Sequence, residues 1–144
     1  MRVARAAVTV DDETVGAIGA GLLIYLGVGA ADTDADADYM ADKLAGLRLF
    51  EDPSGRMNLD LAAIAGGALV VPQFTLYGDV RRGRRPAFDA AMEPVRAEAL
   101  YRRVVELLRG RGLTVETGRF RTHMRVDAVN DGPVTILVDS GRAF

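Results

Sequence analysis

The fold prediction starts from one stretch, Ala68-Leu69-Val70-Val71-Pro72-Gln73-Phe74-Thr75-Leu76. Its apolar first half is typical of a strand buried on both faces. We expect the strand to run over residues 68–76. Period-two alternation then puts Gln73 and Thr75 on one face and Phe74 on the other. If that face is buried, the amide and the hydroxyl need hydrogen-bond partners, so they are either satisfied core groups or part of a binding site.

A second polar interruption, Asn130-Asp131-Gly132-Pro133-Val134-Thr135, precedes another apolar run. Glycine permits unusual dihedral angles and lets a ligand approach the backbone closely. Most X-Pro bonds in folded proteins are trans, and an ordinary turn at the entry to a strand also explains the dipeptide. Two polar clusters in apolar strands, separated by a whole subdomain, suggest two walls of one pocket.

The remaining segments predict one domain over residues 1–144. Helices are expected over residues 36–44, with aspartates in the first turn, and over residues 94–109, beginning at Pro94. Alternating or continuous apolar runs predict further strands over residues 3–10, 15–18, 21–28, 47–50, 114–117, 124–129 and 134–139. The expected fold class is α+β: a strongly bent, barrel-like, mainly antiparallel β-sheet covered by two helices.

The composition excludes several classes of protein. Hydrophobic residues make up 49% and charged residues 26%, as in globular domains. No apolar run reaches the roughly 18 residues of a membrane span, and no signal-peptide pattern follows the first residue. We therefore expect no membrane association and a cytoplasmic location. The absence of cysteine excludes disulfides, thiolate metal sites and a cysteine nucleophile.

Side chains that carry catalysis are scarce. His123 is the only histidine and lies in a polar stretch, so we expect it on the surface rather than in a triad or a zinc site. Residues 32–36 imitate the start of a calcium loop, but Ala37 and Lys43 stand where Gly and Glu are required, and we interpret the acids as a helix start. We expect no metal and no cofactor. Catalysis must then use backbone groups, amides, hydroxyls or the substrate itself.

The net charge of −2 conceals an asymmetry. Residues 1–72 carry 11 acidic and 5 basic side chains, and residues 73–144 carry 9 and 13, which gives −6 and +4. A local basic patch can contact a phosphate backbone. The 17 arginines beside a single lysine equally fit a composition bias, with the arginines as solvated surface. The densest cluster is Arg81, Arg82, Arg84 and Arg85.

The two polar segments, with four further stretches, resemble the D-aminoacyl-tRNA deacylase family over nearly the whole chain. The family signatures are a Ser-Gln-Phe-Thr-Leu strand and an Asn-x-Gly-Pro-Val-Thr turn, which residues 72–76 and 130–135 match. The supporting stretches are Arg2-Val3-Ala4-Arg5-Ala6-Ala7-Val8-Thr9-Val10, Gly55-Arg56-Met57-Asn58-Leu59, Gly83-Arg84-Arg85-Pro86-Ala87-Phe88 and Glu116-Thr117-Gly118-Arg119-Phe120.

The resemblance implies a homodimer that hydrolyses the ester of D-aminoacyl-tRNA as chiral proofreading in translation, and also accepts glycyl-tRNA mischarged on tRNA(Ala). It implies that the aminoacyl-tRNA acceptor end binds at a catalytic segment made of Gln73, Phe74 and Thr75. A cis Gly132–Pro133 bond would enter the partner's pocket, braced by Arg2. The arginines of residues 81–85 are expected to contact tRNA phosphates. Substrate binding and rejection of L-amino acids are implied for Gly132, Pro133, Asn130, Val134, Thr135, Phe120 and Met124.

The chain departs from the family pattern at Pro72, which replaces the usual serine and removes a hydroxyl near the pocket. A Pro-Gln start is similar to that of a related deacylase that clears L-alanine, although that relative lacks the phenylalanine kept here as Phe74. Two alternatives follow. The chain is an enzyme of the same fold acting on an L-aminoacyl ester, or a non-catalytic RNA-binding module that uses the arginines.

The implied geometry gives a physical account of selectivity. Two main-chain oxygens around Gly132–Pro133 would hold the α-ammonium group, so that an L side chain strikes the backbone while a D side chain points to open space. Such a clash can discriminate more strongly than an added contact. The N–H groups around Phe74 and Thr75 would stabilise the oxyanion, and the 2′-hydroxyl of the terminal adenosine would assist water. The alternative, Thr75 as nucleophile, has no visible base.

Overall fold

The computed structural model describes residues 1–143, which form one mixed sheet, a small ladder and two helices. The helices are α1 (Asp34–Gly46) and α2 (Pro94–Gly110), and a 3-10 turn, η1, spans Phe74–Tyr77. A separate ladder pairs β4 (Phe50–Glu51) with β5 (Met57–Leu59). The main sheet contains β1 (Arg2–Val10), β2 (Glu13–Ile18), β3 (Gly21–Leu26), β6 (Gly67–Pro72), β7 (Thr114–Thr117) and β8 (Arg125–Asn130).

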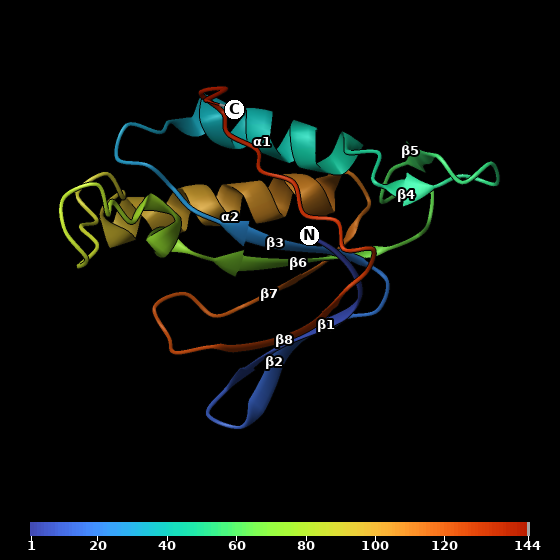
Figure 1. Ribbon diagram of the computed structural model, residues 1–144, viewed down its shortest axis with the longest axis horizontal. Coiled ribbons are helices and arrows are strands. Elements are labelled where there is room, and N and C mark those ends of the chain that lie inside the picture. The colour runs from blue at the N-terminus through green and yellow to red at the C-terminus, as the bar shows by residue number, and fades with distance from the viewer. Residues whose placement is uncertain (144) are drawn as a thin grey trace.

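The main sheet is strongly bent, as the sequence predicted. Its order is β2-β1-β3-β6-β7, with β8 paired to β1. The ladders of β1 are antiparallel, whereas β3–β6 and β6–β7 are parallel, so the sheet is mixed. The two ends of the sheet nearly close into a barrel, because a Cβ on Gly16 of β2 would lie only 2.4 Å from the Thr117 carbonyl oxygen of β7. Both helices cover the same face (Figure 1).

Two apolar cores hold the layers together. One lies between the helices and the sheet, where α2 buries Ala97, Leu100, Tyr101, Val104, Val105 and Leu108 at the helical spacing that the sequence showed. The other lies inside the curve of the sheet and is built largely from alternate residues of the strands, such as Ala6 and Val8 of β1 and Leu69 and Val71 of β6. Within residues 1–143, neither helix is long and apolar enough to span a bilayer.

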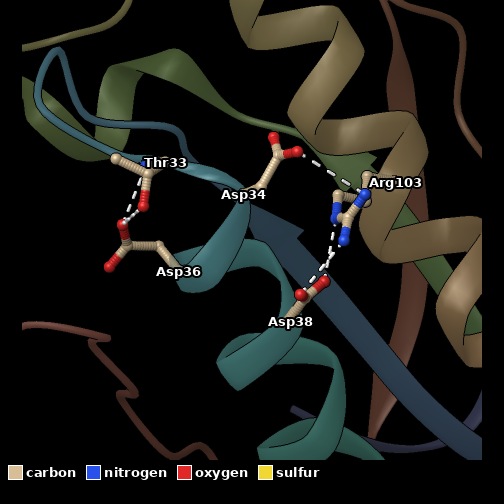
Figure 2. A network of polar contacts seen from close by, with 5 residues as sticks. All are labelled: Thr33, Asp34, Asp36, Asp38 and Arg103. Carbon is tan, nitrogen blue, oxygen red and sulfur yellow. Dashed lines mark hydrogen bonds and ion pairs between the residues drawn. The ribbon is translucent and has the colours of Figure 1, made fainter.

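The aspartates at the start of α1 are structural, as predicted. The backbone N–H and the hydroxyl of Thr33 both donate to the Asp36 carboxylate at 2.8 Å, which orders the first turn. Asp34 and Asp38 form ion pairs with Arg103 of α2, at 3.6 and 2.8 Å (Figure 2). These acids therefore join the two helices to each other.

The strand expected over residues 21–28 ends two residues early, at Leu26, and three other strand predictions are wrong in larger part. The strand expected over residues 68–76 ends at Pro72, and the chain then turns into η1. The strand expected over residues 47–50 is reduced to Phe50, which pairs with the unforeseen β5. Residues 134–139 form no strand, and their backbone joins no ladder among residues 1–143.

Candidate active site

The first part of the candidate site follows the end of β6. The last pairing of β7 with β6 joins Thr117 to Val70, so no neighbouring strand faces Pro72 on that side, and its missing N–H costs nothing there. Gln73 still bonds to β3, since its N–H donates to the Leu26 carbonyl at 2.9 Å. The sharp turn of η1 then begins. The strand ends where both of its neighbours end, not where its hydrophobicity ends.

Gln73 and Thr75 are close together because the chain turns at η1, and not because they share one face of a strand as predicted. The Gln73 amide donates a hydrogen bond to the Thr75 hydroxyl. Phe74 is 59% exposed, and its ring packs edge-on against Phe88 with centroids 5.0 Å apart. The first N–H groups of a helical turn have no partner within it. No hydrogen bond from the N–H of Phe74 or Thr75 to residues 1–143 is found, so both donors are free for a ligand.

The loop between β7 and β8 forms a second side of this site. A Cβ on Gly118 would lie 2.7 Å from the Met124 sulfur and 3.4 Å from the Pro72 ring, so these three residues are in close contact. The Arg119 N–H donates to the Met124 sulfur at 3.4 Å. Phe120 packs on Tyr101 of α2, with ring centroids 6.0 Å apart. Met124 and Phe120 thus lie on the loop that contacts the end of β6. Gly118, which sequence reasoning quoted but gave no role, permits this contact.

The Asn130–Thr135 segment forms a separate, compact turn. The Asn130 side chain accepts from the Val134 N–H and donates to the Thr135 hydroxyl, both at 3.2 Å. The Gly132–Pro133 peptide bond is cis, as the resemblance implied. Gly132 has φ 125°, a conformation that favours glycine. Asn130 and Thr135, expected to bind substrate, therefore hold the turn itself.

Arg2 anchors this turn to the body of the protein. Its side chain is only 9% exposed and donates to the carbonyls of Leu49 at 2.8 Å and Asp131 at 3.2 Å. Its backbone adds two hydrogen bonds of 2.9 Å, one to the Val134 carbonyl and one from the Asp131 N–H. The turn is therefore held from both its ends.

The two motifs lie at opposite ends of the sheet within one chain. The turn adjoins the start of β1, because Val3 pairs with both Asn130 and Gly21, and Gly21 pairs with the first residue of β6. Gln73 directly follows the last residue of β6 and lies six residues after the first, which is about 20 Å at the rise of a strand. Figure 1 shows η1 and the β7–β8 loop at one end and the end of β8 at the other. The predicted walls of one pocket do not meet within a single chain.

The arginine-rich loop follows η1 at the same end of the sheet. Arg81 donates to both carboxylate oxygens of Asp79, and this pairing lowers the pKa of Asp79 to about 2. The other three arginines, Arg82, Arg84 and Arg85, are exposed. His123 is exposed as well, as predicted. A ligand at η1 would therefore sit beside a basic rim.

Free N–H groups beside an amide and a hydroxyl, at the open end of a bent sheet, can stabilise an oxyanion of the kind that forms in ester and acyl-transfer chemistry. A model of the family described as D-Tyr-tRNA(Tyr) deacylase matches residues 1–139. The D-aminoacyl-tRNA deacylase of Symbiobacterium thermophilum is 62% identical, over 99% of this chain and 95% of the relative. That of Thermotoga petrophila is 59% identical, over 99% and 96%. The chain belongs to the D-aminoacyl-tRNA deacylase family.

Two solved structures are similar to this chain. A protein described as c-Myc DNA unwinding element binding protein superposes with a TM-score of 0.87 at 40% identity, covering 94% of this chain and 92% of its own. A probable eukaryotic D-amino acid tRNA deacylase gives a TM-score of 0.78 at 20% identity, covering 92% of each chain. The second likeness shows that the fold is shared.

Proposed function

We propose that this chain hydrolyses the ester bond of D-aminoacyl-tRNA in the cytoplasm and releases the free D-amino acid and the tRNA. The observation that carries the proposal is the pair of free N–H groups at Phe74 and Thr75, which flank an amide–hydroxyl pair at an open end of the sheet. The substrate ester is already activated, so it needs charge stabilisation and positioning more than a strong base. The family match over residues 1–139 supports the substrate class.

The reaction follows from these groups. Water attacks the ester carbonyl, and the developing oxyanion accepts hydrogen bonds from the N–H groups of Phe74 and Thr75. The 2′-hydroxyl of the terminal adenosine assists the attack, the bond to the 3′-oxygen breaks, and the proton from water passes to that oxygen. Thr75 acts as an orienting group. Its hydroxyl accepts a hydrogen bond from Gln73, and no histidine or carboxylate of residues 1–143 bonds to it as a base.

Stereochemistry is imposed by the Gly132–Pro133 turn of a second copy. The carbonyls of Gly132 and Pro133 accept no hydrogen bond from residues 1–143, so they are available to an α-ammonium group. An L side chain would then strike the main chain, whereas a D side chain would not. Glycine offers no side chain to reject, so glycyl-tRNA is accepted too.

The arrangement of one chain supports a homodimer. A groove of about 550 Å³ runs along β3 between residues 135–140 and Leu76, and so connects the turn to η1. Its rim is apolar, with Leu76 and Ile136 about half exposed and Leu137 69% exposed. A two-fold axis across the middle of this surface would carry the turn of each copy to η1 of the other. A second copy would cover the exposed apolar side chains and complete both sites at once.

The central test is a time course with purified protein on D-tyrosyl-tRNA, L-tyrosyl-tRNA, glycyl-tRNA and L-alanyl-tRNA. We expect hydrolysis of the D-tyrosyl and glycyl esters and little of the other two. Preferred hydrolysis of L-alanyl-tRNA would instead assign the activity that Pro72 suggested. RNA binding without loss of the ester would show a non-catalytic module.

Two further measurements test the mechanism and the shared site. Single-turnover hydrolysis by Thr75→Ala should fall only modestly, since a fall of several orders of magnitude would make Thr75 the nucleophile. A mixture of a Gly132→Val chain and a Gln73→Ala chain should recover activity, because a mixed dimer has one site with both intact parts. Recovery should be absent if each site is built within one chain.

A further inference from the structure

A second cleft adjoins the candidate active site and has a different chemistry. It has a volume of about 390 Å³ and lies between α2 and the start of the β7–β8 loop. Gly118 and Phe120 line it, and Gly118 also contacts Pro72 and Met124 of the active site. We call it the α2 cleft. A ligand in the active site that extends past Gly118 therefore enters the α2 cleft.

Three arginines surround the α2 cleft: Arg102 and Arg109 on α2, and Arg119 on the loop. Arg102 and Arg109 are seven residues apart, two helical turns or about 10 Å, so they lie on one face of the helix. Glu98 binds Arg102 at 2.7 Å, and Glu106 binds Arg109 at 3.1 Å. Three cations against two carboxylates leave the lining positive on a chain whose net charge is −2.

The guanidinium groups keep capacity for another anion. The Nε and one Nη of Arg102 both donate to a single carboxylate oxygen of Glu98, which leaves the other N–H groups of the guanidinium free to donate. Among residues 1–143, the Arg119 guanidinium group forms one ion pair, with the Glu13 carboxylate at 3.9 Å. The aromatic ring of Phe120 is half-buried against Tyr101, and its remaining surface lines the cleft. Arginines around an aromatic ring form the usual platform for single-stranded nucleotides.

We propose that the α2 cleft binds the single-stranded nucleotides that precede the terminal adenosine of the substrate, with their phosphates on Arg102 and Arg119 and a base against Phe120. This proposal rests on the proposed function, because it takes the direction of the substrate from the ester placed at η1. The cleft is a positioning and affinity site. None of its arginines touches the reacting ester.

The test compares three substrates of increasing length: the D-tyrosyl ester of adenosine, the D-tyrosyl ester of the trinucleotide CpCpA, and D-tyrosyl-tRNA. The variants are Arg102→Gln and Arg119→Gln. The matched control is Arg103→Gln, because Arg103 is the next residue on α2 but pairs with Asp34 and Asp38 of α1 (Figure 2). Thermal denaturation of each variant checks that it remains folded.

We expect Arg102→Gln and Arg119→Gln each to raise KM about tenfold for the trinucleotide and tRNA esters, with kcat unchanged, because each removes a charge-assisted phosphate contact. The adenosine ester should be unaffected. The salt dependence of kcat/KM on the trinucleotide should weaken by about 0.7 in logarithmic slope per arginine. Arg103→Gln should match the wild type on all three substrates.

Glu98→Gln gives a result of the opposite sign, which a merely structural role would not produce. It frees the Arg102 guanidinium and removes a negative charge from the cleft, so KM for the trinucleotide ester should fall. Equal KM changes for the adenosine ester and the trinucleotide, or none for either, would overturn the proposal. If the wild type hydrolyses none of the three esters, the proposed function itself fails, and that outcome is distinct from the others.

Discussion

Replacement of Arg2 tests whether the Gly132–Pro133 turn must be held in place from the body of the protein. The Arg2 side chain, 9% exposed, donates to two carbonyl oxygens, those of Leu49 and Asp131. Arg2→Met keeps most of the aliphatic packing but leaves both oxygens without these donors. At about 1–2 kcal/mol for each orphaned group, unfolding should become easier by about 2–4 kcal/mol.

A matched control lies three residues away on the same strand. Arg5 also pairs with an aspartate of β8, Asp127, but its side chain is 62% exposed. Surface ion pairs contribute about 0–1 kcal/mol, so Arg5→Met should change stability by less than about 1 kcal/mol. The difference between the two variants isolates the buried contacts of Arg2.

The assay is urea denaturation at a fixed protein concentration, because a dimer couples stability to concentration. Hydrolysis of D- and L-tyrosyl-tRNA is followed in parallel. A turn displaced by about 1 Å should lower kcat/KM for the D substrate by roughly tenfold or more, and the ratio of D to L rates should fall. If Arg2→Met lost no more stability than Arg5→Met and kept the full D-to-L ratio, the bracing role assigned to Arg2 would be refuted.

Three further outcomes follow from single groups. Gly132→Ala should lower both the rate of D-tyrosyl-tRNA hydrolysis and the D-to-L ratio. The added Cβ would lie 2.8 Å from Val134 Cγ2, and an alanine at φ 125° is strained by about 1–3 kcal/mol. Unchanged rates in the time course would contradict this prediction. Tyr101→Phe removes the hydroxyl that donates to the Val70 carbonyl at 2.8 Å, but the Gly118 N–H still donates to that oxygen. Urea denaturation should therefore show a loss of only about 1 kcal/mol in the free energy of unfolding. A loss of more than about 3 kcal/mol would be inconsistent with this reasoning. Burial raises the pKa of Tyr101 from 10.0 to about 12, so its contribution to stability should be complete below about pH 10 and be lost as the pH rises toward about 12. The Tyr101→Phe variant should show a shallower decline over that range in unfolding measurements.

The elements with strong local signals could be predicted from the sequence. The apolar stripe of α2 and its first residue, Pro94, determined that helix to within one residue at its C-terminal end. The continuous apolar runs of β3 and β6 marked the two central strands, because parallel strands covered on both faces carry no alternation. The barrel-like sheet followed from the resemblance and from the excess of strands over helices.

The conformation predicted for the candidate segment was wrong, because a strand was expected through residue 76 and the structure has a turn there. Gln73 and Thr75 were expected side by side on a strand, yet they meet through η1. Nothing in the residues from Val71 to Leu76 says where the ladder stops, because the neighbours β3 and β7 end it. The stopping point depends on pairing partners that are distant in sequence, so local propensity could not supply it.

The failed strand at residues 134–139 points beyond the single chain. Val134-Thr135-Ile136-Leu137-Val138 has the β-branched, apolar character of a strand, yet its backbone runs beside β3 without joining the ladder. A local signal and the fold of one chain disagree here, and natural sequences seldom leave such a conflict unresolved. In the homodimer proposed above, a two-fold axis that lies across this segment and brings each Gly132–Pro133 turn to the η1 of the second copy would also reverse the direction of the segment, so the two copies of it would run antiparallel. The strand pairing that is absent within one chain would then come from the same second copy that we propose completes the candidate active site.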